Sequence, residues 1–272
     1  MIMDCIRIKS ELVEQLIAIS MEAGDAILEF YNTEIDFQIK PDSSPLTKAD
    51  LKSNSIIVKR LKALTPNIPI LSEEEADISF DIRSKWNEYW LIDPLDGTKE
   101  FINKNGEFTV NIALIRDHNP IFGIIHLPVK NHTYWGYDEK GSFFLDQNNS
   151  IKKIKVSKNT NGPIKIAASR SHPSDELNNL LHKIKNYKLL NVGSSLKFCL
   201  IASGELDIYP RFGPTSEWDI AAGHAIVKFA GGVIIDRNGS LIKYNKKKSY
   251  INKDFIASNS LLLGEKYLKL IK

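Results

Sequence analysis

Hydrophobic positions recur at helical spacing in two N-terminal segments. In residues 10–31, apolar side chains return every three or four positions, which predicts an amphipathic helix. Gly24 interrupts this pattern at a cost of about 1 kcal/mol relative to alanine, so we expect close packing there. Residues 47–64 predict a second helix, with Thr47 as N-cap and Asp50 in the first turn, where the helix dipole favours a carboxylate.

Short apolar runs predict strands in the rest of the N-terminal half. The expected strands are a half-buried one at 35–39 and buried ones at 68–71 and 89–92. The last run is followed by Asp93 and Pro94, and Pro94 is expected to end strand pairing because it has no N–H to donate. From 106 to 156, apolar segments separated by turns predict an antiparallel meander.

The pattern changes after the lysine-rich connection 152–158 and the turn-rich residues that follow it. Strands then alternate with helices, which favours an α/β arrangement. Strands are expected at 164–168, 187–192, 206–209, 233–235 and 255–257, and helices at 175–184, 195–203, 218–230 and the C-terminus. We therefore expect two domains, an N-terminal α+β domain at 1–157 and a C-terminal α/β domain at 158–272.

Composition restricts the class of protein. The chain has 272 residues, 43% of them hydrophobic, and 36 basic residues against 33 acidic ones, whereas nucleic-acid binders usually carry a larger and more localised basic excess. Its two cysteines, Cys5 and Cys199, form no CxxC motif, which indicates a reducing compartment. Neither a signal peptide nor an apolar run of about 20 residues is visible, so we expect a cytoplasmic protein without a transmembrane segment.

Candidate chemistry begins where the strand at 89–92 ends. Asp93 and Asp96 follow it across a tight turn, and Gly97 and Thr98 come where a helix could start. Paired carboxylates beside free helical N–H groups suit a hard cation and a phosphate. Asp-Pro-x-Asp-Gly is also common turn chemistry, so the string alone leaves both interpretations open.

Other acids occupy comparable positions. Glu73 follows the strand at 68–71 and could share a cation with Asp93 if the two strands are neighbours, although a run of three glutamates is usually a solvated face. Asp219 begins an alanine-rich helix, where an acid can simply favour the helix dipole, and Asp50 has the same alternative as a capping residue. Because these acids come from both halves of the chain, a cleft between domains could bring them together.

Three motifs carry a family resemblance. Residues 71–74 (LSEE), 90–98 (WLIDPLDGT) and 218–223 (WDIAAG) resemble the signatures of the inositol monophosphatase superfamily, which also contains the fructose-1,6-bisphosphatases. The resemblance extends over essentially the whole chain, and it rests on the order and spacing of all three motifs. It implies a two-domain layered αβαβα sandwich with the site between the domains.

The resemblance also implies roles. The Mg²⁺ ligands, for two or more ions, would be Glu73, Asp93, Asp96, Asp219 and the backbone carbonyl of Leu95. An all-oxygen ligand set suits Mg²⁺, and no His pair has zinc-site spacing. Thr98, with Glu73 and Asp50, would orient and deprotonate the attacking water, while the N–H groups of Gly97 and Thr98 hold the phosphate.

Within the superfamily, the chain is most similar to the bacterial 3′(2′),5′-bisphosphate nucleotidases of sulfate assimilation. The similar stretches are 99–101, 105–111, 169–172, 193–199 and 209–215. The resemblance implies substrate contacts from Leu95, Asp96, Gly97, Thr98, Ser169, His172, Gly193, Lys197 and Asp219. Arg211 is a further candidate for phosphate, or alternatively a surface arginine.

The implied reaction is Mg²⁺-dependent removal of the 3′-phosphate of adenosine 3′,5′-bisphosphate to give AMP, and action on its sulfated analogue is a further expectation. An inositol-1-phosphatase or broad sugar phosphatase is the main alternative, and an inactive RNA-binding module is a more distant one. A covalent aspartyl phosphatase is disfavoured because Asp93 and Asp96 do not form an Asp-x-Asp nucleophile motif. We expect a monomer or homodimer that binds no nucleic acid stably, and the resemblance leaves open a peripheral location at the inner face of the cell membrane.

Overall fold

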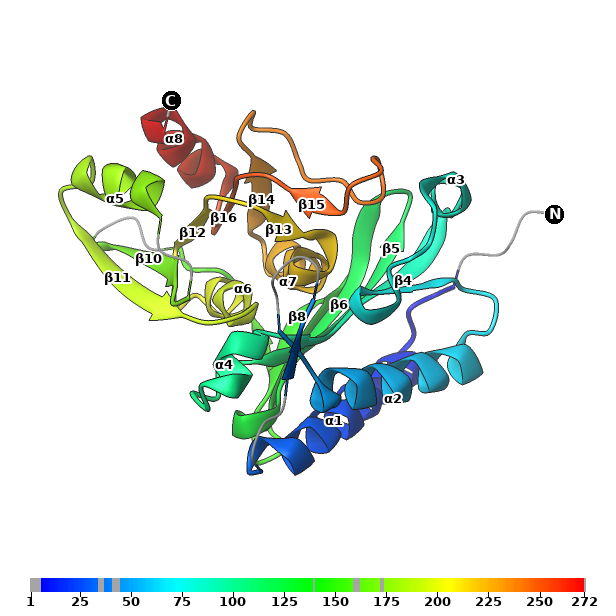
Figure 1. Ribbon diagram of the computed structural model, residues 1–272. Helices are drawn as coiled ribbons and strands as arrows, with labels where there is room; N and C mark the ends of the chain where they lie inside the picture. The colour runs from blue at the N-terminus through cyan, green and yellow to red at the C-terminus, as the bar shows by residue number, and fades with distance from the viewer. Residues whose placement is uncertain are drawn as a thin grey trace.

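Two large β-sheets, of seven and five strands, alternate with three helical layers, which gives the order αβαβα and confirms the expected sandwich (Figure 1). The computed structural model describes residues 6–33, 37–40, 45–138, 140–158, 162–171 and 174–271. None of the helices within these ranges is both long and apolar enough to cross a membrane.

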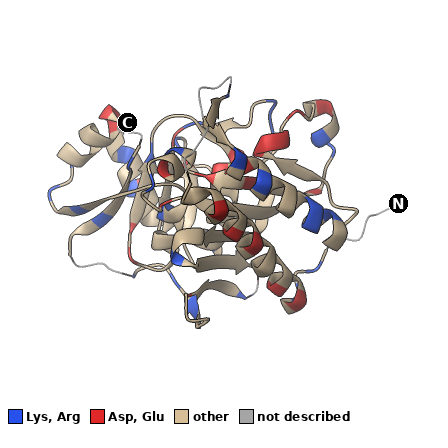
Figure 2. Cartoon of the chain, turned by 60° about the horizontal axis from the view of Figure 1, so that its bottom comes forward, with Lys and Arg blue, Asp and Glu red and all other residues tan. Residues whose placement is uncertain are grey.

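The first layer consists of α1 (Ser10–Tyr31) and α2 (Lys48–Leu64), both at the predicted positions. Thr47 caps α2 as predicted, because its hydroxyl accepts from the backbone N–H groups of Ala49 and Asp50. The outward side of this layer carries acids of α1 beside bases of α2, for example the Glu22–Arg60 ion pair (Figure 2). This face therefore has no single-sign charge of the kind that attracts nucleic acid.

Gly24 in α1 confirms the expected close packing. A Cβ at this position would lie 2.6 Å from Cδ2 of His126 in the underlying sheet. The imidazole of His126 therefore occupies the space that a larger residue in α1 would need.

The second layer is a seven-stranded sheet in the order β3-β4-β5-β6-β7-β8-β9. β3 pairs in parallel with β4, Ile70 opposite Trp90, so the two strands expected to be neighbours are neighbours. The other pairings are antiparallel, as the meander requires. The strands are β3 (Ile70–Ser72), β4 (Glu88–Asp96), β5 (Thr109–Arg116), β6 (Asn119–Leu127), β7 (His132–Tyr137), β8 (Gly141–Leu145) and β9 (Ile151–Ile154).

The prediction that Pro94 ends strand pairing is wrong. β4 continues to Asp96, which pairs with Thr109 after an irregularity in register that begins at Asp93. A bulge leaves its extra residues out of the ladder, so the missing N–H of Pro94 removes no ladder hydrogen bond. Its carbonyl instead accepts a hydrogen bond from the Ser53 hydroxyl at 2.7 Å.

The central helical layer contains α6 (Leu196–Ala202) and α7 (Glu217–Phe229). α7 packs closely on the seven-stranded sheet, since a Cβ on Gly123 of β6 would lie 2.3 Å from the carbonyl oxygen of Ala222. Buried residues of the first sheet and of this helical layer belong to one continuous hydrophobic cluster. The C-terminal half of the chain thus supplies the helix that covers the N-terminal sheet.

The second sheet has the order β11-β10-β12-β16-β14, with α5 (Asp175–His182) and α8 (Leu261–Ile271) on its outer face (Figure 1). Its first two pairings are parallel and the rest antiparallel. The strands are β10 (Ile164–Ser169), β11 (Tyr187–Val192), β12 (Ile208–Arg211), β14 (Val233–Asp236) and β16 (Phe255–Ser258). The predicted domain boundary falls between β9 and β10, where the chain leaves one sheet for the other, and the boundary itself stays a prediction.

Short elements complete the chain. They are β1 (Phe37–Ile39), β2 (Pro45–Thr47), η1 (Glu73–Glu75), α3 (Phe80–Arg83), α4 (Thr98–Ile102), η2 (Pro128–Lys130), β13 (Thr215–Ser216) and β15 (Ile251–Asn252). The strand expected at 35–39 is described only from Phe37, and it is exposed rather than half-buried. Within the described residues it belongs to a two-stranded sheet with the short strand β2.

Candidate active site

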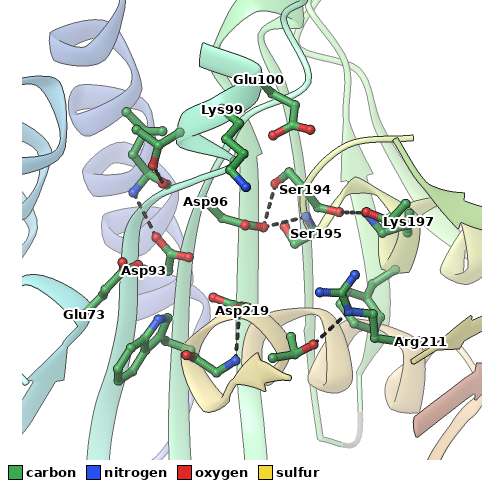
Figure 3. Close-up of a pocket in the computed structure, with 18 of the residues that line it drawn as sticks. Glu73, Asp93, Asp96, Lys99, Glu100, Ser194, Ser195, Lys197, Arg211 and Asp219 are labelled. Atoms are coloured by element: carbon green, nitrogen blue, oxygen red, sulfur yellow. Dashed lines mark hydrogen bonds between the residues drawn. The ribbon is translucent and has the colours of Figure 1, made fainter. Parts of the chain in front are cut away.

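Three carboxylates meet where the two halves of the chain face each other. Glu73 follows β3, Asp93 lies near the end of the neighbouring parallel strand β4, and Asp219 is the third residue of α7. Each offers an oxygen within 4.8 Å of the other two, and Figure 3 shows their side chains directed toward one another. The structure therefore brings together three of the four predicted acidic ligands.

The electrostatics of this triad favour a bound cation. Burial and the neighbouring carboxylates raise the pKa of Asp93 and of Asp219 well above the usual range. The pKa of Glu73 is raised too, mainly by burial. Crowded carboxylates repel one another unless protons or a cation neutralise them, and hard divalent cations prefer oxygen ligands. The donor set thus fits Mg²⁺ chemically.

Lys40 is a charged neighbour of this site that sequence reasoning missed. Its Nζ lies 2.7 Å from Glu73 Oε1 and 2.8 Å from Glu74 Oε1. Burial disfavours the charge on Lys40, but the two glutamates outweigh that effect and raise its pKa. Lys40 was missed because nothing in the sequence distinguishes this lysine, next to a proline in an expected loop, from an ordinary surface lysine.

Asp96 has a different environment from the triad. Its Oδ2 accepts hydrogen bonds at 2.6 Å from the Ser194 hydroxyl and from the Ser195 backbone N–H (Figure 3). Asn111 Nδ2 approaches the same oxygen at 3.4 Å. One oxygen of Asp96 therefore joins β4 to the turn that precedes α6.

The proposed catalytic hydroxyl lies beside Asp50. Thr98 Oγ1 is 3.4 Å from Asp50 Oδ1 and 3.4 Å from the carbonyl of Leu95. The other Asp50 oxygen accepts from the backbone N–H of Thr47 at 2.8 Å and from its hydroxyl. Asp50 is a capping residue and a partner of Thr98 at the same time, so the two interpretations of it are compatible. Burial raises the pKa of Asp50.

The cleft above the acids has a polar wall from the C-terminal half. Ser169 lines it at the end of β10, together with Ser194, Ser195, Lys197 and Arg211. Lys99 and Glu100 of α4, which belong to the N-terminal half, line it too, and Glu100 lies next to Ser194 (Figure 3). Gly97 is the N-cap residue of this helix and has φ 87°, a left-handed conformation that glycine adopts without strain.

Lys197 is buried, at 4% exposure, yet it borders the cleft. Its Nζ donates to the carbonyls of Val192 at 3.0 Å and Ser194 at 2.5 Å. Burial lowers the pKa of Lys197 to about 8, although nearby Asp96 acts in the opposite direction. The ammonium group thus stabilises the turn that holds Asp96, in addition to the role predicted for it with substrate.

Three other residues are predicted to contact substrate or phosphate: His172, Gly193 and Arg211. His172 lies outside the described residues. Gly193 does not line the cleft; its N–H donates to Glu107 Oε2 at 2.7 Å, and a Cβ there would lie 2.6 Å from Cγ of Glu100. Arg211 lines the cleft and donates to the Thr215 hydroxyl at 2.9 Å.

Fold and site together define a carboxylate-lined cleft between two layered halves, with an oxygen donor set that suits a divalent cation. Residues 8–272 match the inositol monophosphatase family model. The chain belongs to the inositol monophosphatase family.

Within this family, the chain is similar to several proteins with a more specific name. The chain is 43% identical over 246 residues to "3′(2′),5′-bisphosphate nucleotidase CysQ" of Salmonella typhimurium, covering 90% of this chain and 98% of that protein. It is 45% identical over 252 residues to the protein of the same name from Buchnera aphidicola, with coverages of 91% and 94%. The crystal structure of CysQ from Bacteroides thetaiotaomicron, a bacterial member of the family, superposes with a TM-score of 0.78 at 35% identity, covering 90% of this chain and 97% of that one.

Proposed function

We propose that this protein is a Mg²⁺-dependent 3′(2′),5′-bisphosphate nucleotidase that converts adenosine 3′,5′-bisphosphate to AMP and phosphate. The observation that carries the proposal is 43% and 45% identity to two proteins named for this activity, along nearly their full length. The carboxylate triad and the polar cleft above it supply a site of matching chemistry. Activity on the sulfated analogue belongs to the same proposal.

Glu73, Asp93, Asp96, Asp219 and the Leu95 carbonyl would hold the Mg²⁺, and we propose two or more ions. When bound, Mg²⁺ neutralises phosphate charge and lowers the pKa of a coordinated water. Glu73 directly follows β3, Asp93 lies in the adjacent strand β4 and Asp219 lies in α7, so the packing of α7 on the sheet determines the distance between Asp219 and the other two. The cation-binding residues are thereby preorganised by the fold rather than by one loop.

Thr98 and Asp50 would accept the proton that the attacking water loses. The Thr98 hydroxyl accepts a hydrogen bond from the water and donates its own hydrogen to Asp50 Oδ1, to which it is already oriented. The water oxygen forms the new bond to phosphorus while the ester bond to the ribose 3′ oxygen breaks. The proton of the attacking water passes through Thr98 toward Asp50, and the departing 3′ oxygen takes up a proton from a second water to become the 3′-hydroxyl of AMP. The raised pKa of Asp50 makes this carboxylate a better proton acceptor. Glu73 would help to orient the water.

The phosphate to be cleaved would lie against the start of α4. Gly97 and Thr98 present backbone N–H groups there, at the positive end of the helix. Ser169, His172 and Lys197 would bind the nucleotide and its second phosphate, with the positive charge of Lys197 on the side of the cleft formed by the C-terminal half. Gly193, whose N–H donates to Glu107, would contribute through the turn that it begins with Ser194 and Ser195. Arg211 adds a second cationic group on that side.

Phosphate release from the purified protein tests this proposal. Adenosine 3′,5′-bisphosphate and inositol-1-phosphate are compared in Mg²⁺ and after removal of metal with a chelator. We expect kcat/KM at least about 100-fold higher for the bisphosphate, which corresponds to about 2.7 kcal/mol of transition-state discrimination, and no release after chelation. A preference for inositol-1-phosphate would contradict the nucleotidase assignment while leaving the metal site intact.

A further inference from the structure

The chain between β14 and β16 contains a segment, residues 244–252, that contacts both sides of the carboxylate site. We name it the 244–252 strap. It includes β15 and extends from the C-terminal sheet toward the side of the molecule that carries α3 (Figure 1). None of the proposed catalytic, metal-binding or substrate-binding residues lies in it.

Tyr250 of the strap touches the segments that hold Glu73 and Asp219. Its hydroxyl lies 2.9 Å from the carbonyl of Ala76 and 3.2 Å from that of Ile78, directly after η1, which begins with Glu73. Its own carbonyl accepts from the backbone N–H of Glu217, the first residue of α7, at 2.9 Å. Its ring packs 5.1 Å from that of Trp218. A single residue thus joins the Glu73 segment to the first turn of α7.

Arg83 makes the second connection from the N-terminal half. It is only 1% exposed, and its guanidinium lies over the rings of Phe80 and Tyr250, 4.9 and 4.2 Å from their centroids. Nη2 donates to the carbonyls of Lys247 at 3.1 Å and Lys248 at 2.5 Å, and Nη1 donates to Asn245 Oδ1. The planar fork of arginine suits several simultaneous acceptors, which lysine could not match.

Asn245 extends this network to α7. Its side-chain amide donates back to the Arg83 carbonyl at 2.6 Å. Its backbone N–H lies 3.0 and 2.9 Å from the two carboxylate oxygens of Glu217, a fully buried residue two positions before Asp219. Hydrogen bonds from the strap therefore fix the first turn of α7, and hydrogen bonds with Arg83 of α3 fix the strap.

Burying the charged groups of Arg83 and Glu217 costs desolvation free energy, and well-packed apolar residues in their place would often give the protein equal stability. What a buried polar network adds is a defined geometry, because Nη1 and Nη2 of Arg83 meet their acceptors in one arrangement of the parts, while Nε of Arg83 has no hydrogen-bond partner among the described residues. Glu73 and Asp219 come from opposite halves of the chain. A defined distance between these two carboxylates is a requirement for high affinity toward a small cation such as Mg²⁺.

We propose that Arg83 and Tyr250 are positioning residues for cation binding: through the strap, they hold the Glu73 segment and the first turn of α7 in the relative position that a divalent ion needs. This inference rests on the proposed metal site. Loosening the strap lowers Mg²⁺ affinity without removing a ligand.

Tyr250→Phe in the full-length protein tests the inference, since it removes the hydroxyl contacts to Ala76 and Ile78 and keeps the ring. Mg²⁺ binding is measured directly by isothermal titration calorimetry, alongside the Mg²⁺ dependence of phosphate release. We expect about tenfold weaker Mg²⁺ binding, the lower end of the effect of losing an outer-shell partner. At saturating Mg²⁺, KM for the bisphosphate stays within about twofold of wild type. Arg83→Lys, which keeps the charge without the fork, should weaken binding in the same direction.

Tyr244→Phe is the matched control. The Tyr244 hydroxyl is equally part of this region, fully buried, and bonds to His224 Nδ1 at 2.9 Å, away from the Glu73 segment. We expect this variant to lose thermal stability and keep wild-type Mg²⁺ affinity. Unchanged affinity in Tyr250→Phe, or equal losses in both tyrosine variants, would overturn the positioning role. A wild-type protein that binds no Mg²⁺ would instead overturn the metal site and, with it, this inference.

Discussion

The backbone N–H of Ser195 donates a hydrogen bond to Asp96 Oδ2 at 2.6 Å, although the two residues are 99 positions apart in sequence. Ser194 donates to the same oxygen, from a backbone with φ 51°. A residue that the motif marks as a metal ligand thus also holds the two halves of the site together. Because these hydrogen bonds go to Oδ2, we assign the proposed metal-binding role of Asp96 to Oδ1.

Asp96→Asn should lower kcat/KM for the bisphosphate by at least about 100-fold, the scale of losing one electrostatic group in an active site. The substitution removes the charge and keeps the shape. Ser194→Ala removes only one donor to Oδ2 and should cost less than about tenfold, since a neutral hydrogen bond contributes about 0.5–1.5 kcal/mol. Steady-state phosphate release, with circular dichroism as a check of folding, measures both. Equal losses would contradict separate roles for the two oxygens.

Lys197→Met should raise KM for adenosine 3′,5′-bisphosphate about tenfold or more and change kcat/KM for inositol-1-phosphate far less. The reason is that the proposed partner of Lys197 is the phosphate that is not cleaved, which inositol-1-phosphate lacks. Methionine keeps most of the buried volume of the side chain. Parallel kinetics with both substrates provide the measurement. If both substrates lost the same factor, the hydrogen bonds from Lys197 to Val192 and Ser194 would account for its whole contribution.

Gly123→Ala should destabilise the protein by about 1–3 kcal/mol, as overpacking does, and should also weaken Mg²⁺ binding. The added Cβ would lie 2.3 Å from the carbonyl oxygen of Ala222 in α7, so the helix that carries Asp219 has to move. Gly136→Ala is the control, because its Cβ would lie 2.5 Å from Oγ of Ser142 in β8 and 3.1 Å from Cα of Ile226, which is further along α7 from Asp219. Urea unfolding and Mg²⁺ titration of both variants should give similar stability losses and unequal affinities. Unchanged Mg²⁺ affinity in Gly123→Ala would show that the position of α7 tolerates the shift.

His126 should make the protein less stable in mild acid. Burial lowers its pKa to about 4, below the value of about 6.5 in an unfolded chain. Between these two values the unfolded state binds a proton that the folded state does not, so stability falls as pH falls, by up to about 1.4 kcal/mol per pH unit. Urea unfolding from pH 4.5 to 7 should show a shallower pH dependence in His126→Gln than in wild type. If the free energy of unfolding depended on pH in the same way in both proteins, protonation of His126 would not be linked to stability.

Local signals in the sequence account for much of the fold and the candidate site. The helices at 10–31 and 47–64 and the meander follow from hydrophobic spacing, and Thr47 caps α2 as its residue type indicates. The acids at the ends of the strands at 68–71 and 89–92 could be paired because parallel neighbours end at the same edge of a sheet. At Pro94 the local rule failed, because a bulge accommodates a proline that a regular ladder would not.

The sequence alone determined most of the helices and strands and marked the residues proposed to carry the chemistry, because both are encoded in spacing and residue type over a few positions. The tertiary structure decided which charges meet. Lys40 beside Glu73, Asp96 beneath Ser195, and Arg83 against the 244–252 strap are contacts between segments far apart in the chain. Such contacts depend on how the two sheets pack around α7, and the energy of a buried charge depends on every partner that this packing brings to it.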